Sequence, residues 1–245
     1  MSAIDTYFDN LEAILDRTLR SQSGAMEEAA RHIADSLRQG GMVYTFGTGH
    51  GHLLALEVFY RAGGMARVCP VMDEKLMLHV SAAGSTREER REDWAEVLLR
   101  RYPMKAGDVL IAISNSGRNA APVMLARAAR ERGVYVIALT SLAHTRAVTA
   151  RNSLHRRLFE EADLVLDNGG VLGDASVAFP DGSMVGPTST AVGAAILQAI
   201  VCRVKELSLE GGFEADFFKS SNVDGGDAWN DRLIAEYGDM IPGLK

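Results

Sequence analysis

Cysteine is scarce in this chain, and its two copies form no pattern. The 245 residues include only Cys69 and Cys202, which lie far apart in apolar surroundings. This predicts two reduced, buried thiols, with a disulfide as the less favoured alternative, and their spacing matches no metal-binding motif. We therefore predict no metal-ligand residues from the cysteines.

Long hydrophobic runs are also missing. The longest apolar stretch, 191–202, is interrupted by Gln198 and falls short of the roughly 20 residues that a membrane-spanning helix needs. The first residues carry acidic side chains early and contain no uninterrupted apolar segment of the kind found in secretory signals. We expect a cytoplasmic protein without a membrane partner.

An excess of positive charge is absent as well. Lysine and arginine number 26 against 32 aspartates and glutamates, which gives a net charge of −6. No overall field attracts nucleic acid or an anionic membrane surface, so neither is an expected partner. Hydrophobic residues at 47% and charged residues at 24% are typical of a globular protein and exclude a disordered or fibrous chain.

Short apolar runs separated by helical segments fill the middle of the chain. They are apolar throughout rather than alternating, which is typical of a parallel sheet covered on both faces. We predict an α/β, three-layer doubly wound fold with a five-stranded parallel sheet in the flavodoxin-like order 2-1-3-4-5, with extra N- and C-terminal helices. The predicted strands are 42–46, 66–72, 108–113, 134–139 and 164–166.

We predict one domain over residues 1–245. It comprises N-terminal helices in 1–39, an α/β core in 40–210 and a C-terminal tail in 211–245. Helical periodicity indicates two N-terminal helices, the second from about Gly24, and a solvent-facing charged helix over 87–101 that includes the mixed-sign run 87–92. Further predicted elements are helices at 53–61, 187–209 and 227–237 and a hairpin around Asp181-Gly182.

Two polar loops each follow a buried strand directly. The first reads GTGHGH over 47–52 and the second reads SNSGRN over 114–119. Their glycines allow backbone N–H groups to converge, and the helix after each loop adds partial positive charge, which suits a phosphate. In the predicted topology both loops border the point where the strand order reverses. The candidate phosphate-binding residues are Gly47, Thr48, Gly49, Ser114, Asn115, Ser116, Gly117 and Asn119.

These loops, together with GDVLIAISNSGRNAAPV and VIALTS, resemble the sugar isomerase (SIS) domain. GTGHGH, FYRAGG, VGPTST and SSNVDGGD are also similar to a bacterial SIS subgroup over nearly the whole chain, with phosphoheptose isomerases as more distant relatives. The resemblance implies a phosphorylated sugar on the serine-rich loop and a homodimer, or a dimer of dimers, with sites near the interface. Two departures stand out: Gly51 replaces the usual serine of the first loop, and Asn119 replaces the usual threonine of the second.

Three side chains are the candidates for proton transfer. Glu57 follows the first loop among apolar neighbours, where desolvation would raise its pKa, although a structural ion pair with Arg61 at i+4 is an open alternative. His50 and His52 lie in the loop itself and could open the sugar ring or move a hydroxyl proton. No cofactor is expected. A divalent metal such as zinc, held by these three side chains, stays an open alternative.

The resemblance adds two further contacts, and the polar, glycine-rich composition of the tail suggests a third. In SIS proteins the start of the long helix borders the site, which implies ligand contacts from Thr188 and Ser189. The polar segment from Lys219 could close over the ligand, with Lys219 near an anionic group.

We therefore expect an aldose–ketose isomerase of carbohydrate metabolism that acts on a phosphosugar. Glu57 would transfer the proton between C1 and C2 through a cis-enediol(ate). A phosphosugar sensor without chemistry, or a phosphosugar lyase or etherase, are the alternatives.

Overall fold

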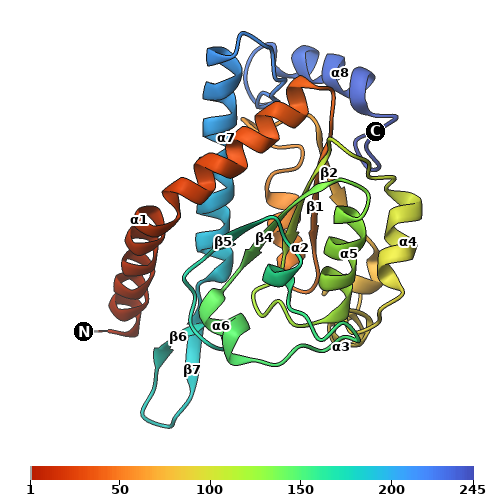
Figure 1. Ribbon diagram of the computed structural model, residues 1–245. Coiled ribbons are helices and arrows are strands. Elements are labelled where there is room, and N and C mark those ends of the chain that lie inside the picture. The colour runs from red at the N-terminus through yellow and green to blue at the C-terminus, as the bar shows by residue number, and fades with distance from the viewer. Residues whose placement is uncertain (1) are drawn as a thin grey trace.

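A five-stranded parallel sheet forms the centre of the computed structural model, which describes residues 2–245 (Figure 1). Its order is β2-β1-β3-β4-β5, so the predicted fold class and strand order are confirmed. β1 lies between β2 and β3, with Gly47 opposite Ile113 at its carboxyl end. The strands are β1 (Val43–Gly47), β2 (Val68–Val71), β3 (Val109–Ile113), β4 (Tyr135–Thr140) and β5 (Leu164–Asp167).

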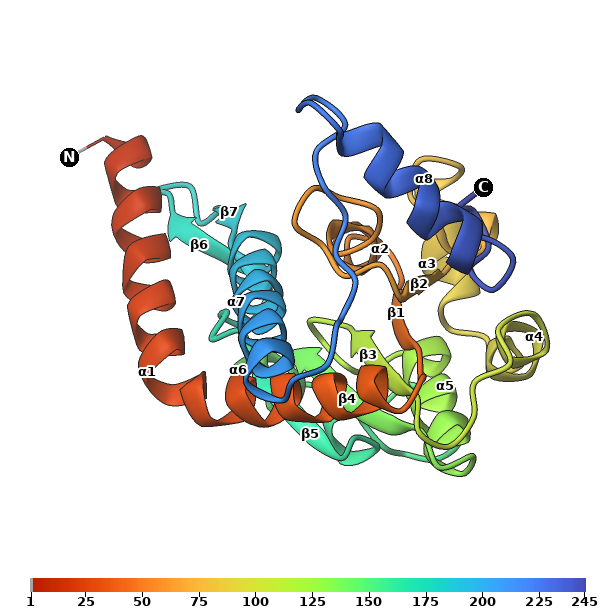
Figure 2. The same cartoon turned by 90° about the horizontal axis from the view of Figure 1, so that it is seen from above.

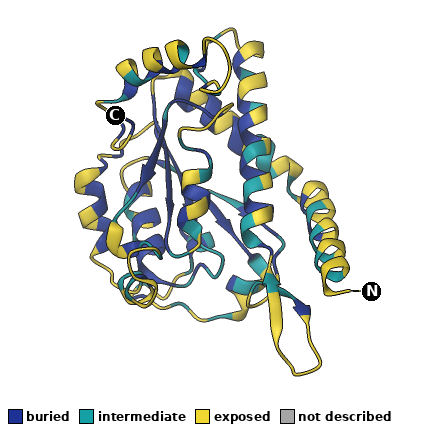
Figure 3. Cartoon of the chain, turned by 180° about the vertical axis from the view of Figure 1, so that it is seen from behind, coloured by how far each residue is buried: buried dark blue, intermediate teal, exposed yellow. Residues whose placement is uncertain are grey.

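Helices cover both faces of the sheet, which explains why its strands are hydrophobic throughout. Helices α4 (Trp94–Arg101) and α5 (Ala120–Arg130) pack on one face, and α1 (Ala3–Arg38), α2 (Gly51–Glu57) and α7 (Ser189–Glu210) pack on the other. The strands β1 to β4 are accordingly buried between two layers, and the edge strand β5 is partly buried (Figure 3).

The N-terminal region is one helix, where the sequence predicted two. α1 runs for 36 residues and passes through Gly24 without a break. A Cβ atom at Gly24 would meet no other atom within 4 Å, so no close contact requires glycine there. A single glycine inside a helix costs about 1 kcal/mol, too little to break a helix that is packed elsewhere. Packing is provided by the C-terminal half, where Ala29, Ala30 and Ile33 are fully buried, largely against α7.

The first half of α1 projects from the body beside a two-stranded hairpin, β6 (Ala175–Ala178) and β7 (Met184–Pro187) (Figures 1 and 2). This hairpin was predicted around Asp181-Gly182. Tyr7 donates a hydrogen bond to the Pro187 carbonyl at 3.1 Å, and Asn10 donates one to the Ser176 carbonyl at 2.8 Å. We call this projecting unit the arm.

The charged segment 87–101 is two helices instead of one. α3 (Ala82–Glu88) includes the first two residues of this segment and α4 starts at Trp94, so the chain turns at Glu89. The break moves Glu89 out of the solvent-facing row predicted for 87–92. α2 ends at Glu57, four residues earlier than the predicted helix.

The remaining elements are short, apart from the helix of the tail. They are the 3-10 turns η1 (Glu74–Leu76) and η2 (Leu158–Glu160), and helices α6 (Leu142–Ala147) and α8 (Gly226–Tyr237). No helix among residues 2–245 is long and apolar enough to cross a membrane.

Candidate functional site

The two polar loops lie side by side at the carboxyl ends of β1 and β3, as adjacent parallel strands require. Between them is a cavity of about 380 Å³. Its lining takes Thr48, Gly49 and His50 from the first loop and Ser114, Asn115, Ser116 and Asn119 from the second. The structure thus brings together the loops that the sequence analysis paired.

Glycine is required in the first loop because the chain folds tightly on itself. A Cβ on Gly47 would lie 2.3 Å from the backbone of Gly51, and a Cβ on Gly51 would lie 2.9 Å from the Ile113 carbonyl oxygen. Real Cβ atoms do not approach backbone so closely. The glycine at position 51, which departs from the family pattern, is therefore explained by close packing of α2 on β3. Gly47 supports the loop without lining the cavity.

Hydrogen bonds to Ser114 and Asn115 fix the serine-rich loop, while other hydrogen-bond donors in the loop have no acceptor. The Ser114 hydroxyl accepts a hydrogen bond from the Gly117 N–H at 3.2 Å, and the Asn115 amide oxygen accepts one from Asn168 at 2.9 Å. Gly117 is left-handed (φ 57°), which turns the chain below the cavity, so it shapes the loop without lining it. Across residues 2–245, no acceptor is found for the N–H groups of Asn115 and Ser116 or for the Ser116 hydroxyl.

Of the two carboxylates that line this cavity, Glu89 and Asp174, Glu89 is the one between the two loops. The sequence analysis placed Glu89 on a solvated face. Its Oε2 accepts a hydrogen bond from the Thr48 hydroxyl at 2.7 Å, and its Oε1 accepts one from the Asn119 amide at 2.7 Å. It therefore joins the two loops. Burial raises the pKa of Glu89, against the opposing effects of the Thr48 hydrogen bond and of the charges on Arg90 and Arg151. A raised carboxyl pKa in a cleft is typical of an acid–base group.

A second wall of the cavity is formed by residues that follow β4 in the sequence. His144 in α6, Asn168 after β5 and Asp174 line it. Asp174 has a left-handed backbone (φ 71°), and its carboxylate accepts hydrogen bonds from the Thr188 N–H at 3.2 Å and the Ser189 N–H at 2.9 Å. It also accepts one from the Ser189 hydroxyl, so it caps α7. No sequence motif had marked these three wall residues.

Several of the predicted site residues lie elsewhere. Glu57 does not line the cavity: it pairs with Arg61 at i+4 and accepts a hydrogen bond from Gln198 at 3.2 Å. The structural alternative for Glu57 is thus the arrangement observed. His52 is buried, with its Nδ1 bonded to the Gly49 carbonyl and its ring near His79.

The contacts implied for the long helix and the tail also differ from expectation. Thr188 is fully buried below the cavity surface, whereas Ser189 lines the cavity with its hydroxyl engaged by Asp174. Lys219 lies over the ring of Trp229, 4.2 Å from its centroid, away from the cavity of its own chain.

The proposed zinc ligands are not brought together. Within residues 2–245 no group of three or more His, Cys, Asp and Glu side chains is arranged to hold a metal ion. Of His50, His52 and Glu57, only His50 lines the cavity. These three side chains thus do not form a metal site in this chain.

Buried polar atoms without partners gather around the cavity. Asn119 Oδ1 and His144 Nδ1 belong to lining residues, and Thr188 Oγ1 lies just below the lining. Buried polar groups in native proteins are nearly always bonded, so such atoms call for an explanation. The two atoms of lining residues are buried beneath the surface of the cavity, so they do not face the open space between the loops.

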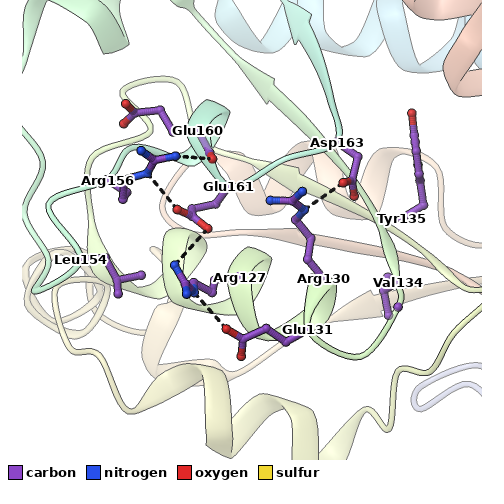
Figure 4. Close-up of a pocket in the computed structure, with 11 residues that line it drawn as sticks. Arg127, Arg130, Glu131, Val134, Tyr135, Leu154, Arg156, Glu160, Glu161 and Asp163 are labelled. Atoms are coloured by element: carbon purple, nitrogen blue, oxygen red, sulfur yellow. Dashed lines mark hydrogen bonds and ion pairs between the residues drawn. The ribbon is translucent and has the colours of Figure 1, made fainter.

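A larger hollow of about 780 Å³ lies at the opposite, amino-terminal edge of the sheet, between the end of α5 and the start of β4 (Figure 4). Its three arginines are already paired: Arg127 with Glu131 at 3.0 Å, Arg130 with Asp163 at 2.9 Å and Arg156 with Glu161 at 3.1 Å. Because the acidic partners neutralise them, this hollow is a weaker anion site than the cavity between the loops.

The SIS domain family model matches residues 6–141, which include both polar loops. The chain belongs to the SIS domain family. A UPF0309 protein of Halalkalibacterium halodurans is 39% identical over 240 residues, covering 98% of this chain and 96% of the relative. A UPF0309 protein of Geobacillus kaustophilus is 40% identical over 242 residues, with coverage of 98% and 96%.

Solved structures share the fold at low identity. A phosphoheptose isomerase from Neisseria gonorrhoeae has a TM-score of 0.55 at 17% identity, over 83% of this chain and 97% of the other. The Vibrio vulnificus NanR protein complexed with ManNAc-6P has a TM-score of 0.53 at 15% identity, over 99% of this chain and 71% of the other. The SIS model match ends at residue 141, so the wall of His144, Asn168 and Asp174 lies outside it.

Proposed function

We propose that this SIS protein binds a phosphorylated sugar in the cavity between the two loops and interconverts its aldose and ketose forms. The observation that carries the proposal is a carboxyl group with a raised pKa, Glu89, bonded to both loops beside free backbone donors. Structural neighbours are described as a phosphoheptose isomerase and as a complex with ManNAc-6P, which supports the same ligand class.

The phosphate would lie on the serine-rich loop. Asn115 and Ser116 line the cavity there with N–H groups that have no acceptor in residues 2–245, and α5 begins directly after the loop. No lysine or arginine is among the lining residues, so backbone dipoles would carry the attraction. A sugar attached to this phosphate would extend toward Glu89 and the wall of His144.

Glu89 would act as the carbon base. Its carboxylate removes the C2 proton of the open-chain aldose, which leaves a cis-enediol(ate), and returns that proton to C1 to give the ketose. A carboxyl group whose pKa is raised by burial suits both transfers, because the group must take and release a proton in turn. We assign to Glu89 the role that the sequence analysis gave to Glu57, and we keep His50, which lines the cavity, as a polar contact.

A thermal-shift screen identifies the sugar. Pentose 5-phosphates, hexose 6-phosphates and N-acetylhexosamine 6-phosphates would be compared with their dephosphorylated forms, since a ligand raises the melting temperature by mass action. The best ligand is then incubated with the protein in D₂O. Deuterium at C1 or C2 supports the isomerase; binding without exchange supports the sensor, and loss of a substituent supports the lyase or etherase.

Replacing Ser116 by alanine should weaken the binding of a phosphosugar far more than the binding of its dephosphorylated analogue. The substitution removes one hydroxyl donor to a charged group, a bond worth about 1.5–3 kcal/mol, which corresponds to roughly a tenfold or larger loss in affinity. Calorimetry with both ligands measures the difference. Ser183→Ala, on the exposed hairpin turn, is the control. Equal losses for the two ligands would remove the phosphate from this loop.

We also propose that the protein assembles as a homodimer or a dimer of dimers. The arm exposes Ile4 and Phe8, and α2 exposes Leu53 and Leu56 beside the outer face of α7. Cys202, predicted to be buried, is exposed on that face. Sedimentation equilibrium at micromolar concentration should give two or four times the chain mass of 26.4 kDa. A species of 26.4 kDa would contradict the proposal.

We infer that the protein works in the cytoplasm as one domain. Both cysteines are free thiols, as in proteins kept under reducing conditions.

A further inference from the structure

Three arginines without acidic partners meet at the end of the serine-rich loop. Arg118 directly precedes Asn119, the last residue of that loop. Arg90 directly follows Glu89, whose carboxylate accepts the hydrogen bond of the Asn119 amide. Arg151 comes from the segment after α6, and its N–H donates a hydrogen bond to the Arg118 carbonyl at 2.7 Å. We call Arg90, Arg118 and Arg151 the arginine cluster.

Other side chains do not neutralise the charges of this cluster. Among residues 2–245 none of its arginines forms an ion pair. The Arg118 guanidinium donates only to uncharged oxygens of Thr149, the carbonyl at 2.9 Å and the hydroxyl at 3.3 Å. Burial lowers the pKa of Arg118, and the like charges of Arg151 and Arg90 lower it further. The fold therefore holds three positive charges together although they repel one another.

Acidic groups are present in the same two segments, but they are engaged elsewhere. Glu88 pairs with Arg91 at 3.0 Å. The Glu92 carboxylate accepts hydrogen bonds from the Ser153 N–H and the Ser153 hydroxyl, each at 2.6 Å, which fixes one segment against the other. The positions of the cluster are thus set by hydrogen bonds that leave its charge available to an anion from solvent.

The arginine cluster borders the cavity on the side of Glu89. Arg90 and Arg151 are exposed, whereas Glu89 between them and the loops lines the cavity. The charges of both arginines act on Glu89, and the charge of Arg118 acts on His144, another lining residue. The lining itself contains no lysine or arginine. The cluster therefore supplies positive charge to a cavity whose lining has none.

We propose that the arginine cluster is a second anion site, which holds a carboxylate or a second phosphate of the sugar whose first phosphate lies on the serine-rich loop. This inference rests on the proposed function and narrows its substrates to phosphosugars with two anionic groups. Guanidinium groups form paired hydrogen bonds with the oxygens of carboxylates and phosphates, so the site suits either group. The bound anion also removes the repulsion within the cluster.

Inorganic phosphate tests the site without a choice of sugar. In a titration of the nitrogen-15-labelled protein at low ionic strength, the side-chain Nε–H signals of Arg90 and Arg151 should move and saturate. Unmoved arginine signals would overturn the inference, whether or not the amide signals of Asn115 and Ser116 move. Arginine signals that move while these amides do not would support the second site and count against the proposed phosphate position on the loop.

Paired sugars test the substrate class by calorimetry. Fructose 1,6-bisphosphate is compared with fructose 6-phosphate for a second phosphate, and 6-phosphogluconate with glucose 6-phosphate for a carboxylate. The wild type should bind the doubly anionic member of at least one pair roughly tenfold more tightly, because hydrogen bonds between charged groups are strong. In the double variant Arg90→Gln/Arg151→Gln this preference should fall below about threefold, because glutamine carries no charge.

The pair that shows the preference identifies the second anionic group. Equal affinities within both pairs, or a preference that survives in the double variant, would overturn the inference and leave the proposed function intact. A wild-type protein that binds none of the phosphosugars in the screen would overturn both.

Arg87→Gln/Arg132→Gln is the matched control. Both arginines are exposed and form no ion pair among residues 2–245, and neither charge acts on Glu89 or Arg118. The control removes the same total charge and should keep the wild-type preference. A preference lost equally in the control would show a general charge effect and overturn the assignment to the cluster. The wild-type titration with inorganic phosphate keeps the inference falsifiable if the cluster variant does not fold.

Discussion

Replacing Glu89 by glutamine is expected to lower turnover by two to four orders of magnitude and to leave ligand affinity nearly unchanged. Glutamine keeps the length of the side chain and can still meet Thr48 and Asn119, but it cannot take a proton from carbon. The measurements are steady-state kinetics and the entry of deuterium from D₂O into C1 or C2, which should disappear in the variant.

Glu57→Gln is the matched control. Glu57 makes an ion pair with Arg61 outside the cavity, so this variant should keep turnover within a few-fold of the wild type. The reverse outcome, an active Glu89→Gln and an inactive Glu57→Gln, would return the base to the position that the sequence analysis chose. Such a result would require Glu57 to act in a site formed with another subunit.

Glu89→Gln, which should lower turnover, should leave the stability of the folded protein unchanged or raise it. The folded protein raises the pKa of Glu89 above its ordinary value of 4.5, so it holds this proton more tightly than the unfolded chain does. The free energy of unfolding therefore falls as pH rises from 4.5 through the folded pKa. Glu89→Gln removes this loss, and its melting temperature at neutral pH should equal or exceed that of the wild type. A lower melting temperature would contradict the assigned direction of the shift.

Replacing Gly47 by alanine should have the largest effect on the site as a whole. The new Cβ would overlap the backbone of Gly51 at 2.3 Å, so the first loop and the start of α2 must move. Overpacking against backbone costs about 1–3 kcal/mol or more. We expect a melting temperature several degrees lower and loss of phosphosugar binding, measured by thermal denaturation and calorimetry.

Gly49→Ala in the same loop tests whether this effect is steric. Gly49 has open space around its Cβ position but a left-handed backbone (φ 55°), so alanine there costs only about 1–2 kcal/mol of backbone strain. Gly47→Ala should be the more damaging of the two to ligand binding. Equal behaviour of the variants would show that the contact between Gly47 and Gly51 does not shape the cavity.

The strands and loops could be predicted because each is a local pattern. Apolar runs of four to six residues mark strands buried on both faces, and the glycine- and serine-rich loops follow β1 and β3 directly. Parallel topology then places the ends of both strands at one edge of the sheet. The pairing of the loops therefore follows from sequence and general topology together.

Glu89 could not be predicted because its role depends on where a helix breaks. In the run 87–92 it is one charge among six, and a continuous helix would leave the run in solvent. In the fold α3 ends at Glu88, and the Glu89 carbonyl accepts a hydrogen bond from the Ala121 N–H at 2.9 Å, which fixes the turn beside α5. That contact spans 32 positions in sequence, and no periodicity indicates it.

Glu57 shows the opposite case. Apolar neighbours on α2 suggested a carboxylate in a cavity, but a helix of seven residues turns this side chain toward Arg61 and Gln198. His144 and Asp174 were missed because they come from the segments after β4 and β5. The courses of these segments are set by tertiary contacts such as the Ser141 hydroxyl bond to the Gly170 carbonyl at 2.6 Å. The single-domain division stays a prediction.

The central claim is that a phosphosugar binds between the two loops, and amide NMR tests it most directly. The protein labelled with nitrogen-15 is titrated with the phosphosugar selected by the screen. We predict that the amide signals of Asn115, Ser116 and Asn119 move most, with saturable shifts at Thr48 and Glu89. Shifts confined to the arginine-lined hollow around Arg127 and Arg156, or no shifts at either place, would contradict the account.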